Sequence, residues 1–299
     1  MITFPNAKIN IGLNIVSERP DGYHDLETVF YPINLQDALE INLQKPIETG
    51  LLRHTFETGL LRHDTREEER TEGDGYSLTL VGDRIEGNPN DNLVVRALQL
   101  MRQDFELPAI DIKLFKQIPS GAGLGGGSAD CANMILLLNK RFNLRMTQSS
   151  MERYAAKLGA DCAFFIRNTP VFATGIGTDM TDLDLSLKGY TLVVVKPEIH
   201  VSTKMAYSMV CCGRPEVSLS DAIRRPVEEW KDLIVNDFEQ SVFSFAPEIG
   251  RIKDKLYDMG AIYASMSGSG SAVYGIFRKP LDKPERQFPT LFCVQREML

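Results

Sequence analysis

A glycine-rich loop between two apolar segments is the feature that most constrains how this chain can fold. Five of the seven residues from Gly121 to Gly127 are glycine. The segment before them, Ile110–Ile118, is predicted to be a buried strand. The segment after them, Ser128–Asn139, is apolar on most faces, which is typical of a buried helix. The chain must therefore turn directly from a strand into a helix, and glycine gives the backbone the freedom for that turn.

Such a turn is suited to binding phosphate. The first N–H groups of a helix have no partner inside the helix, and the helix dipole favours an anion at the same end. The alternative interpretation is a flexible loop or a tight packing turn, but a loop that needs only flexibility is seldom placed between a buried strand and a buried helix. The sequence therefore predicts a phosphate-binding loop from Pro119 to Ser128.

The residues around the glycines argue against three common classes of phosphate loop. A Walker A loop requires a lysine directly before the Ser or Thr, whereas Gly127 precedes Ser128 here. The spacing GxGxxG occurs from Gly121 to Gly126, but a dinucleotide-binding unit also needs a strand that ends in Asp or Glu about 20 residues later. The segment Lys140–Met146 supplies neither. A protein kinase needs HRD and DFG sequences downstream, and the sequence contains neither.

Length and composition limit the remaining possibilities. A chain of 299 residues suits two domains of roughly 150 residues each. The net charge of −7 and the lack of a run of Lys and Arg argue against a general nucleic-acid binder. The five cysteines are an odd number without CxxC spacing, and no apolar stretch approaches the ~20 residues that cross a bilayer. We expect a reduced, cytoplasmic protein that binds neither nucleic acid nor membrane, with the oligomeric state open between monomer and homodimer.

Short β-like segments dominate the N-terminal part of the sequence. Four of them are rich in branched residues and predict an antiparallel N-terminal sheet: Lys8–Val16, Glu27–Ile33, Ala38–Leu43 and Tyr76–Val81. Between the last two, the heptapeptide ETGLLRH at Glu48–His54 recurs at Glu57–His63, and the charged run Asp64–Asp74 follows. Two copies do not make a solenoid, so we predict an exposed, mobile hairpin loop there.

Helices and strands alternate in the rest of the chain. Besides the helix after the glycine loop, we predict helices at Asn92–Asp104, Ser149–Leu158, Ser220–Phe245 (broken) and Pro247–Met259. Strands are predicted at Ala160–Ile166, Tyr190–Val195, Ala261–Ser265 and Ala272–Phe277. This content is typical of an α+β fold with two halves, and we place the boundary near residue 160.

Two further motifs accompany the glycine loop. The segment Pro5–Leu13 is PNAKINIGL, and the segment Ser267–Ser271 is SGSGS between two predicted strands. These three blocks in this order resemble the GHMP kinases, the superfamily of galactokinase, homoserine kinase and mevalonate kinase. Two more segments, Arg19–His24 (RPDGYH) and Leu158–Asp161 (LGAD), are similar to one group within it. That group phosphorylates an alcohol linked to cytidine diphosphate in isoprenoid precursor biosynthesis.

The resemblance implies a fold and cofactors. The expected architecture is the two-domain α+β fold of GHMP kinases, with an N-terminal domain like domain 2 of ribosomal protein S5 and a C-terminal ferredoxin-like α/β sandwich. Residues 1–160 would form the ATP-binding domain with the phosphate loop, and residues 161–299 would contribute to the substrate site. An ATP-dependent small-molecule kinase of this kind uses ATP with Mg²⁺ and a small-molecule substrate with a cytidine diphosphate head.

Lys8 and Asp161 are the candidate catalytic residues. Lys8 lies among apolar residues, where a charged side chain is costly unless it meets an anion, and the resemblance implies that it faces the reacting hydroxyl and the γ-phosphate. Asp161 follows an expected helix stop and precedes an apolar run, so its carboxylate is expected at a strand edge, where it can accept a proton. Without the resemblance, the alternative interpretation of Lys8 is a lysine at a sheet edge whose side chain reaches solvent. The alternative interpretation of Asp161 is a turn residue.

The resemblance also implies the binding residues. Those for ATP are Pro119, Gly121, Gly123, Leu124, Gly125, Gly126, Gly127, Ser128, Asn92, Lys116, Ser267 and Gly268, with Asn92, Leu93 and Lys116 near the adenine. Ser128 is also the candidate oxygen ligand for Mg²⁺. Those for the substrate are Asn10, Tyr23, His24, Thr203 and Tyr207. The two tyrosines would sandwich the pyrimidine while His24 hydrogen-bonds its edge.

Two alternatives stay open at this point. Another GHMP kinase, of the homoserine or mevalonate type, would keep Lys8, Asp161 and the glycine loop but would not need Tyr23 and His24. A non-catalytic nucleotide-binding protein of the same fold is the second alternative, because folds persist when activities are lost. The joint presence of the lysine, the aspartate and the loop serine argues against it.

Overall fold

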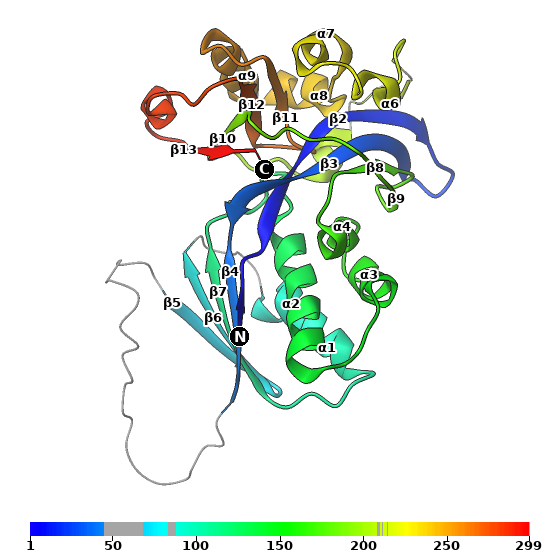
Figure 1. Ribbon diagram of the computed structural model, residues 1–299, viewed down its shortest axis with the longest axis vertical. Helices are drawn as coiled ribbons and strands as arrows, with labels where there is room; N and C mark the ends of the chain where they lie inside the picture. Colours follow the sequence, from blue (N-terminus) through cyan, green and yellow to red (C-terminus); the bar gives the residue numbers. More distant parts are fainter. Residues whose placement is uncertain (45–67, 83–87, 208–209, 211, 214, 299) are drawn as a thin grey trace.

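The glycine loop connects strand β7 (Ile110–Lys116) to helix α2 (Gly126–Phe142) in the lower half of the molecule as drawn in Figure 1. The computed structural model describes residues 1–44, 68–82, 88–207, 210, 212–213 and 215–298. Strand β7 is the middle strand of a five-stranded sheet with the order β1-β4-β7-β6-β5. The other strands of this sheet are β1 (Ile2–Thr3), β4 (Ala38–Leu43), β5 (Glu68–Gly73) and β6 (Tyr76–Gly82).

One face of this sheet is covered by helices. Helices α1 and α2 lie on that face, with α3 and α4 beside them (Figure 1). Besides α2, these helices are α1 (Leu93–Arg102), α3 (Gln148–Ala156) and α4 (Cys162–Arg167). Alternate residues of β7 (Ile110, Ile112 and Leu114) are buried, whereas Asp111 and Lys113 between them are not. Since side chains alternate along a strand, the apolar set of β7 packs into one core with the helices.

Two four-stranded sheets account for the other strands of the described residues. The first has the order β2-β3-β8-β9, and its long strands β2 and β3 pass from the lower to the upper half (Figure 1). Its strands are β2 (Asn6–Glu18), β3 (His24–Gln36), β8 (Val171–Thr174) and β9 (Asp179–Asp182). The second has the order β11-β12-β10-β13. Its strands are β10 (Thr191–Lys196), β11 (Tyr263–Met266), β12 (Val273–Phe277) and β13 (Phe292–Glu297).

The upper half also contains the remaining α-helices. They are α5 (Thr203–Tyr207), α6 (Leu219–Ala222), α7 (Trp230–Leu233), α8 (Phe238–Phe245) and α9 (Pro247–Asp258). Short 3₁₀ turns are η1 (Pro89–Asp91), η2 (Val227–Glu229) and η3 (Pro284–Gln287). Two further apolar clusters join β2 and β3 to the C-terminal sheet and its helices, so both halves are packed on the same pair of long strands.

Two predictions about the N-terminal strands are wrong. The expected single antiparallel sheet is divided: β2 pairs with β3 and β3 with β8, whereas β4 and β6 flank β7, and β6 runs parallel to β7. Local sequence predicts where a strand lies, but its partner is chosen by the packing of distant segments. Part of the charged run expected as a loop, Glu68–Gly73, is strand β5, since the edge of a sheet tolerates charged residues. The duplicated segment Glu48–His63 lies outside the described residues.

The predicted strand Ala160–Ile166 is also wrong. Cys162–Arg167 forms the short helix α4, which ends at Asn168 in the left-handed conformation. An apolar run of this length does not distinguish a buried strand from a buried helix. Asp161 therefore precedes a helix N-terminus and does not lie at a strand edge. The other predicted helices and strands are found with their ends shifted, the predicted broken helix being divided among α6, η2, α7 and α8.

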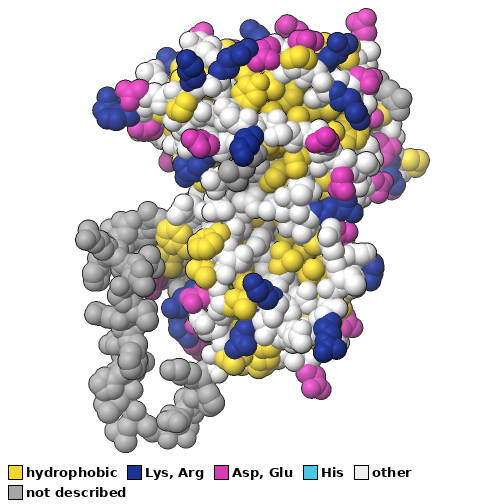
Figure 2. All heavy atoms as spheres, in the orientation of Figure 1, with side chains coloured by type: hydrophobic (Ala, Val, Ile, Leu, Met, Phe, Trp, Pro, Cys, Tyr) yellow, Lys and Arg dark blue, Asp and Glu magenta, His cyan; other side chains and the backbone are white. Residues whose placement is uncertain are grey.

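The surface carries charges of both signs. In Figure 2, Lys and Arg side chains are interspersed with Asp and Glu over the upper half of the face drawn there. A continuous basic stripe, which would follow a nucleic-acid backbone, is not visible on the described part of that face. Within the described ranges, no helix has both the length and the apolar character that crossing a membrane requires.

Candidate active site

The glycine loop leads directly into the N-terminus of α2. Gly121, Gly123 and Gly125 have positive φ angles of +61°, +75° and +71°, which residues with side chains rarely adopt. Gly125 precedes the helix, and no side chain caps its first N–H groups. Gly127 is exposed and Ser128 is half-buried in the first turn. These groups can therefore be reached by an anion placed on the loop.

A second loop, Ser267–Ser271 between β11 and β12, lies directly against the glycine loop. The Ser267 hydroxyl donates to the Gly123 carbonyl at 2.9 Å, although the two residues are 144 positions apart. A Cβ on Gly123 would lie 2.0 Å from the Ser267 carbonyl oxygen. On the other side, the Thr203 and Ser269 hydroxyls are 3.4 Å apart. The two loops predicted to hold ATP are thus in backbone contact, with Thr203 beside them.

Lys8 and Asp161, the two predicted catalytic residues, lie side by side at the edge of the glycine loop. Lys8 Nζ is 3.3 Å from Asp161 Oδ2 and 2.5 Å from Asn10 Oδ1. The side chain of Lys8 is 4% exposed and that of Asp161 is 33% exposed, so the carboxylate is the accessible partner. The Lys8 backbone N–H donates to the Leu124 carbonyl at 2.9 Å, which ties β2 to the loop. Such a pair can attract an anion and accept a proton at one place.

Asn10 is held in place by hydrogen bonds from two directions. Its Nδ2 donates to Thr28 Oγ1 at 3.0 Å, and Thr28 Oγ1 donates to the Gly12 carbonyl at 2.6 Å. The Asn10 backbone N–H donates to Ser267 Oγ at 3.1 Å. Because Asn10 Oδ1 accepts from Lys8, these bonds also fix the position of the ammonium group.

The residues predicted for the substrate include a stacked ring pair. His24, at the start of β3, stacks on Tyr207 of α5 with ring centroids 4.6 Å apart and an interplanar angle of 26°. Phe238 meets Tyr207 edge-on at 4.7 Å, and burial raises the pKa of the Tyr207 hydroxyl. Tyr23 is 62% exposed. In this structure His24 itself covers one face of Tyr207, an arrangement different from the predicted sandwich of a pyrimidine between two tyrosines.

Asn92 and Lys116, predicted near the adenine, have partners within the protein. Asn92 Oδ1 accepts from the Val94 N–H at 3.0 Å and so caps α1. Lys116 Nζ donates to Asp130 at 2.7 Å and also to Asp37. Burial lowers the pKa of Lys116, but the carboxylates of Asp130 and Asp37 outweigh it and leave that pKa raised. Burial, together with the charge of Asp37, raises the pKa of Asp130 to about 7, although Lys116 opposes this.

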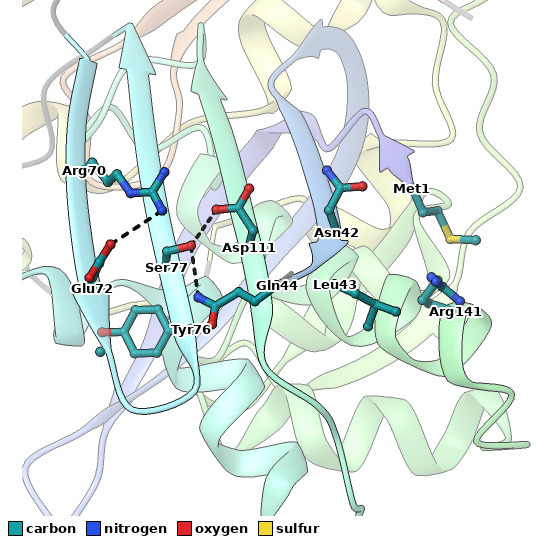
Figure 3. Close-up of a pocket in the computed structure, with 11 residues that line it drawn as sticks. Met1, Asn42, Leu43, Gln44, Arg70, Glu72, Tyr76, Ser77, Asp111 and Arg141 are labelled. Atoms are coloured by element: carbon teal, nitrogen blue, oxygen red, sulfur yellow. Dashed lines mark hydrogen bonds and ion pairs between the residues drawn. The ribbon is translucent and has the colours of Figure 1, made fainter. Parts of the chain in front are cut away.

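One cavity borders the glycine loop and another lies away from it. Lys116 and Pro119 line a cavity of 570 Å³ beside the start of the glycine loop, a size that suits a small ligand. Another cavity, of 800 Å³, lies on the outer face of the five-stranded sheet (Figure 3). There Ser77 donates to Asp111 at 2.5 Å and accepts from Gln44 at 3.2 Å. None of the 11 residues drawn there is a predicted site residue, so we assign it no part in the chemistry.

Three polar residues near the site were not predicted from the sequence: Thr28, Asp37 and Asn236. Asn236 Nδ2 donates to the carbonyls of Met266 and Gly268 at 2.8 and 2.9 Å, which supports the second loop. Of the three, only Asp37 had a local signal, an acid between two apolar segments, and such an acid usually indicates a turn. Their contacts join segments far apart in sequence, which explains why no local pattern revealed them.

Comparison with known proteins identifies relatives along the whole chain. Family models described as the GHMP kinases N terminal domain and GHMP kinases C terminal match residues 92–169 and 218–288. A curated 4-diphosphocytidyl-2-C-methyl-D-erythritol kinase from Bacteroides fragilis is 52% identical over 298 residues, 100% of each chain. One from Bacteroides thetaiotaomicron is 50% identical over 98% of each chain. A crystal structure of 4-(cytidine 5'-diphospho)-2C-methyl-D-erythritol kinase has a TM-score of 0.77 at 25% identity, covering 100% of this chain and 99% of that one.

Proposed function

The chain belongs to the GHMP kinases, among the 4-diphosphocytidyl-2-C-methyl-D-erythritol kinases, and on this basis we propose that it phosphorylates the 2-hydroxyl of 4-diphosphocytidyl-2-C-methyl-D-erythritol with ATP. This reaction serves isoprenoid precursor biosynthesis. The observation within the structure that carries the proposal is the pair of Lys8 and Asp161, 3.3 Å apart beside the glycine loop. The pair supplies a cation for the charge on the transferring group and a carboxylate for the proton of the alcohol.

In the proposed reaction, the substrate hydroxyl oxygen bonds to the γ-phosphorus while the bond from that phosphorus to the β–γ bridging oxygen breaks, and ADP leaves. Asp161 orients the hydroxyl and accepts its proton. Lys8 Nζ stabilises the negative charge on the phosphoryl oxygens. Because Asn10 holds the ammonium at 2.5 Å and is itself fixed by Thr28 and Ser267, little rearrangement is needed when the charge develops.

The glycine loop is proposed to hold the β- and γ-phosphates over the first N–H groups of α2. Mg²⁺ is proposed to accompany ATP, because it would offset the negative charge of the phosphate oxygens. The Ser128 hydroxyl in the first turn of α2 is a hard oxygen donor of the kind that Mg²⁺ prefers. Within the described residues, no three His, Cys, Asp or Glu side chains gather as a metal cage, so phosphates and waters would supply the other ligands.

The cytidine end of the substrate is proposed to bind around His24, Tyr207 and Tyr23. Aromatic rings stack on a nucleobase with a gain of roughly 1–3 kcal/mol per base. Thr203, the first residue of α5, lies close by with its hydroxyl 3.4 Å from that of Ser269 in the second loop, where it can reach a polar group of the substrate. A homoserine or mevalonate kinase would have no use for this group of rings, which favours the cytidine substrate over those alternatives.

The test is ATP turnover with Mg²⁺ by the purified protein, with 4-diphosphocytidyl-2-C-methyl-D-erythritol, homoserine and mevalonate compared as acceptors. We expect ADP release with the cytidine compound alone. Asp161→Asn should lower kcat by roughly 100-fold or more while ATP still binds. Asp182→Asn is the matched control, since Asp182 pairs with Arg167 of α4 and is 77% exposed, and it should keep wild-type turnover.

The other outcomes separate the alternatives. Turnover of homoserine or mevalonate would keep a GHMP kinase but overturn the assignment of the cytidine site. Tight ATP binding without turnover of any acceptor would favour the non-catalytic alternative. Wild-type turnover by Asp161→Asn would refute the role of this carboxylate.

A further inference from the structure

Three ion-paired side chains lie buried beneath the glycine loop. Lys116 Nζ, at the end of β7, donates to Asp130 Oδ2 at 2.7 Å and to Asp37 Oδ2. No side chain of the Asp37–Lys116–Asp130 group is more than 3% exposed. Two carboxylates face one ammonium, and Asp130 Oδ1 has no hydrogen-bond partner among the described residues. Buried ion pairs contribute little to stability, and an unpartnered buried oxygen is costly, so stability alone does not account for this group.

Asp37 connects the start of the glycine loop to the strand that carries Lys8. Its Oδ1 accepts from the backbone N–H groups of Gln117 and Ile118 at 2.5 and 2.8 Å, where the chain leaves β7 for the loop. Its own backbone N–H donates to the Pro5 carbonyl at 2.8 Å, three residues before Lys8. Asp37 therefore contacts two segments of the candidate active site. Its carboxylate contacts the start of the glycine loop, and its backbone N–H contacts the segment that leads into the strand of Lys8.

Lys116 and Asp130 extend this connection to the far end of the loop. Asp130 lies in α2, two residues after Ser128. Lys116 Nζ would be 3.3 Å from a Cβ on Gly126, the first residue of α2, so the amine lies against the helix N-terminus. The Asp37–Lys116–Asp130 group thus joins the strand that enters the loop to the helix that leaves it.

We propose that Asp37 is a positioning residue for phosphoryl transfer, which acts through Lys116 and Asp130 to fix both ends of the glycine loop relative to the strand of Lys8. The inference rests on the proposed function, because only a loop that holds phosphates for transfer needs this fixing. The Asp37 side chain is fully buried, so it would touch neither ATP nor the acceptor. It sets the backbone geometry in which the γ-phosphate meets Lys8 and Asp161, and a misplacement of about 1 Å can cost roughly 100-fold in rate.

The test compares Asp37→Asn with Asp111→Asn. Asp111 lies in β7 at the end far from the glycine loop, where it accepts from Ser77 at 2.5 Å, so the control makes the same Asp-to-Asn change away from the loop. Four quantities are measured on each folded protein: Kd for Mg-ADP by calorimetry, KM for ATP, KM for the cytidine substrate, and kcat. Asp37→Asn should raise Kd for Mg-ADP and KM for ATP by about ten-fold or more and lower kcat. KM for the cytidine substrate should stay within about two-fold, as should all four quantities in Asp111→Asn.

A merely structural role gives a different result. It would lower Tm and the folded fraction but leave Kd and KM of the folded molecules unchanged, and that outcome would overturn the inference. If Asp37→Asn does not fold, Asp130→Asn takes its place, since it leaves the bonds of Asp37 to Gln117 and Ile118 intact. We then expect a rise of about two- to five-fold in Kd for Mg-ADP and KM for ATP, and unchanged constants would again overturn the inference.

The two proposals fail in different ways. Wild-type protein that binds Mg-ADP but does not phosphorylate the cytidine substrate would overturn the proposed function, while the Kd of the variants would still decide the positioning of the loop. Wild-type protein that does not bind Mg-ADP would overturn both.

Discussion

Replacing Gly123 by alanine should separate the two loops of the active site. The φ of +75° at this position costs an alanine about 1–2 kcal/mol. The new Cβ would lie 2.0 Å from the Ser267 carbonyl oxygen and 3.3 Å from that of Gly270. These are backbone atoms that cannot rotate away, so the second loop would have to retreat, at a cost of about 1–3 kcal/mol. Loss of the hydrogen bond from Ser267 to Gly123 adds about 1 kcal/mol, for a total of about 4 kcal/mol.

Urea unfolding of Gly123→Ala and of wild type measures this free-energy cost. KM for ATP, compared between the same two proteins, shows whether ATP binding by the glycine loop is affected. Gly127→Ala is the matched control for stability, because the nearest atom to its Cβ would be Leu93 Cδ1 at 3.6 Å, an ordinary contact. Alanine in the first turn of α2 should stabilise the protein by roughly 0.5–1 kcal/mol relative to glycine. Equal free energies of unfolding for Gly123→Ala and wild type would refute the reasoning, since the loops would then be free to part without loss.

Three further predictions concern other parts of the molecule. Tyr207→Leu removes an aromatic face and should raise KM for the cytidine substrate by about ten-fold while KM for ATP stays within two-fold; equal rises in both would contradict the assignment. Because the pKa of Asp130 is raised from 3.8 to about 7, its contribution to stability is present at low pH and is lost as pH rises through 7. Asp130→Asn should therefore gain stability relative to wild type from pH 5 to pH 8, by at most ~3 kcal/mol in urea unfolding. A stability difference between the two proteins that does not change with pH would contradict this. Burial raises the pKa of the Cys293 thiol to about 11, so at pH 8 only about a thousandth is thiolate, and iodoacetamide should modify the exposed Cys212 well before Cys293 in peptide mass spectrometry.

Several properties of the site follow from sequence patterns because they depend on local chemistry. A phosphate loop needs glycines between a strand and a helix, and these residues are adjacent in the chain. The segments PNAKINIGL and RPDGYH carry the family resemblance in the same local way, and the relatives found along the whole chain confirm it. The domain boundary near residue 160, the cytoplasmic location and the oligomeric state stay predictions.

Other properties were decided only by the tertiary structure. The pairing of β2 with β3 and of β3 with β8, and the helix at Cys162–Arg167, depend on which apolar faces are buried together, and a short apolar run is compatible with either element. The role of Asp37 also depends on the tertiary structure, because in the sequence it is one acidic residue among many. It becomes linked to the glycine loop and to the strand of Lys8 only when folding brings Lys116, Asp130 and Pro5 around it, because a buried charge takes its role from partners that lie tens of residues away.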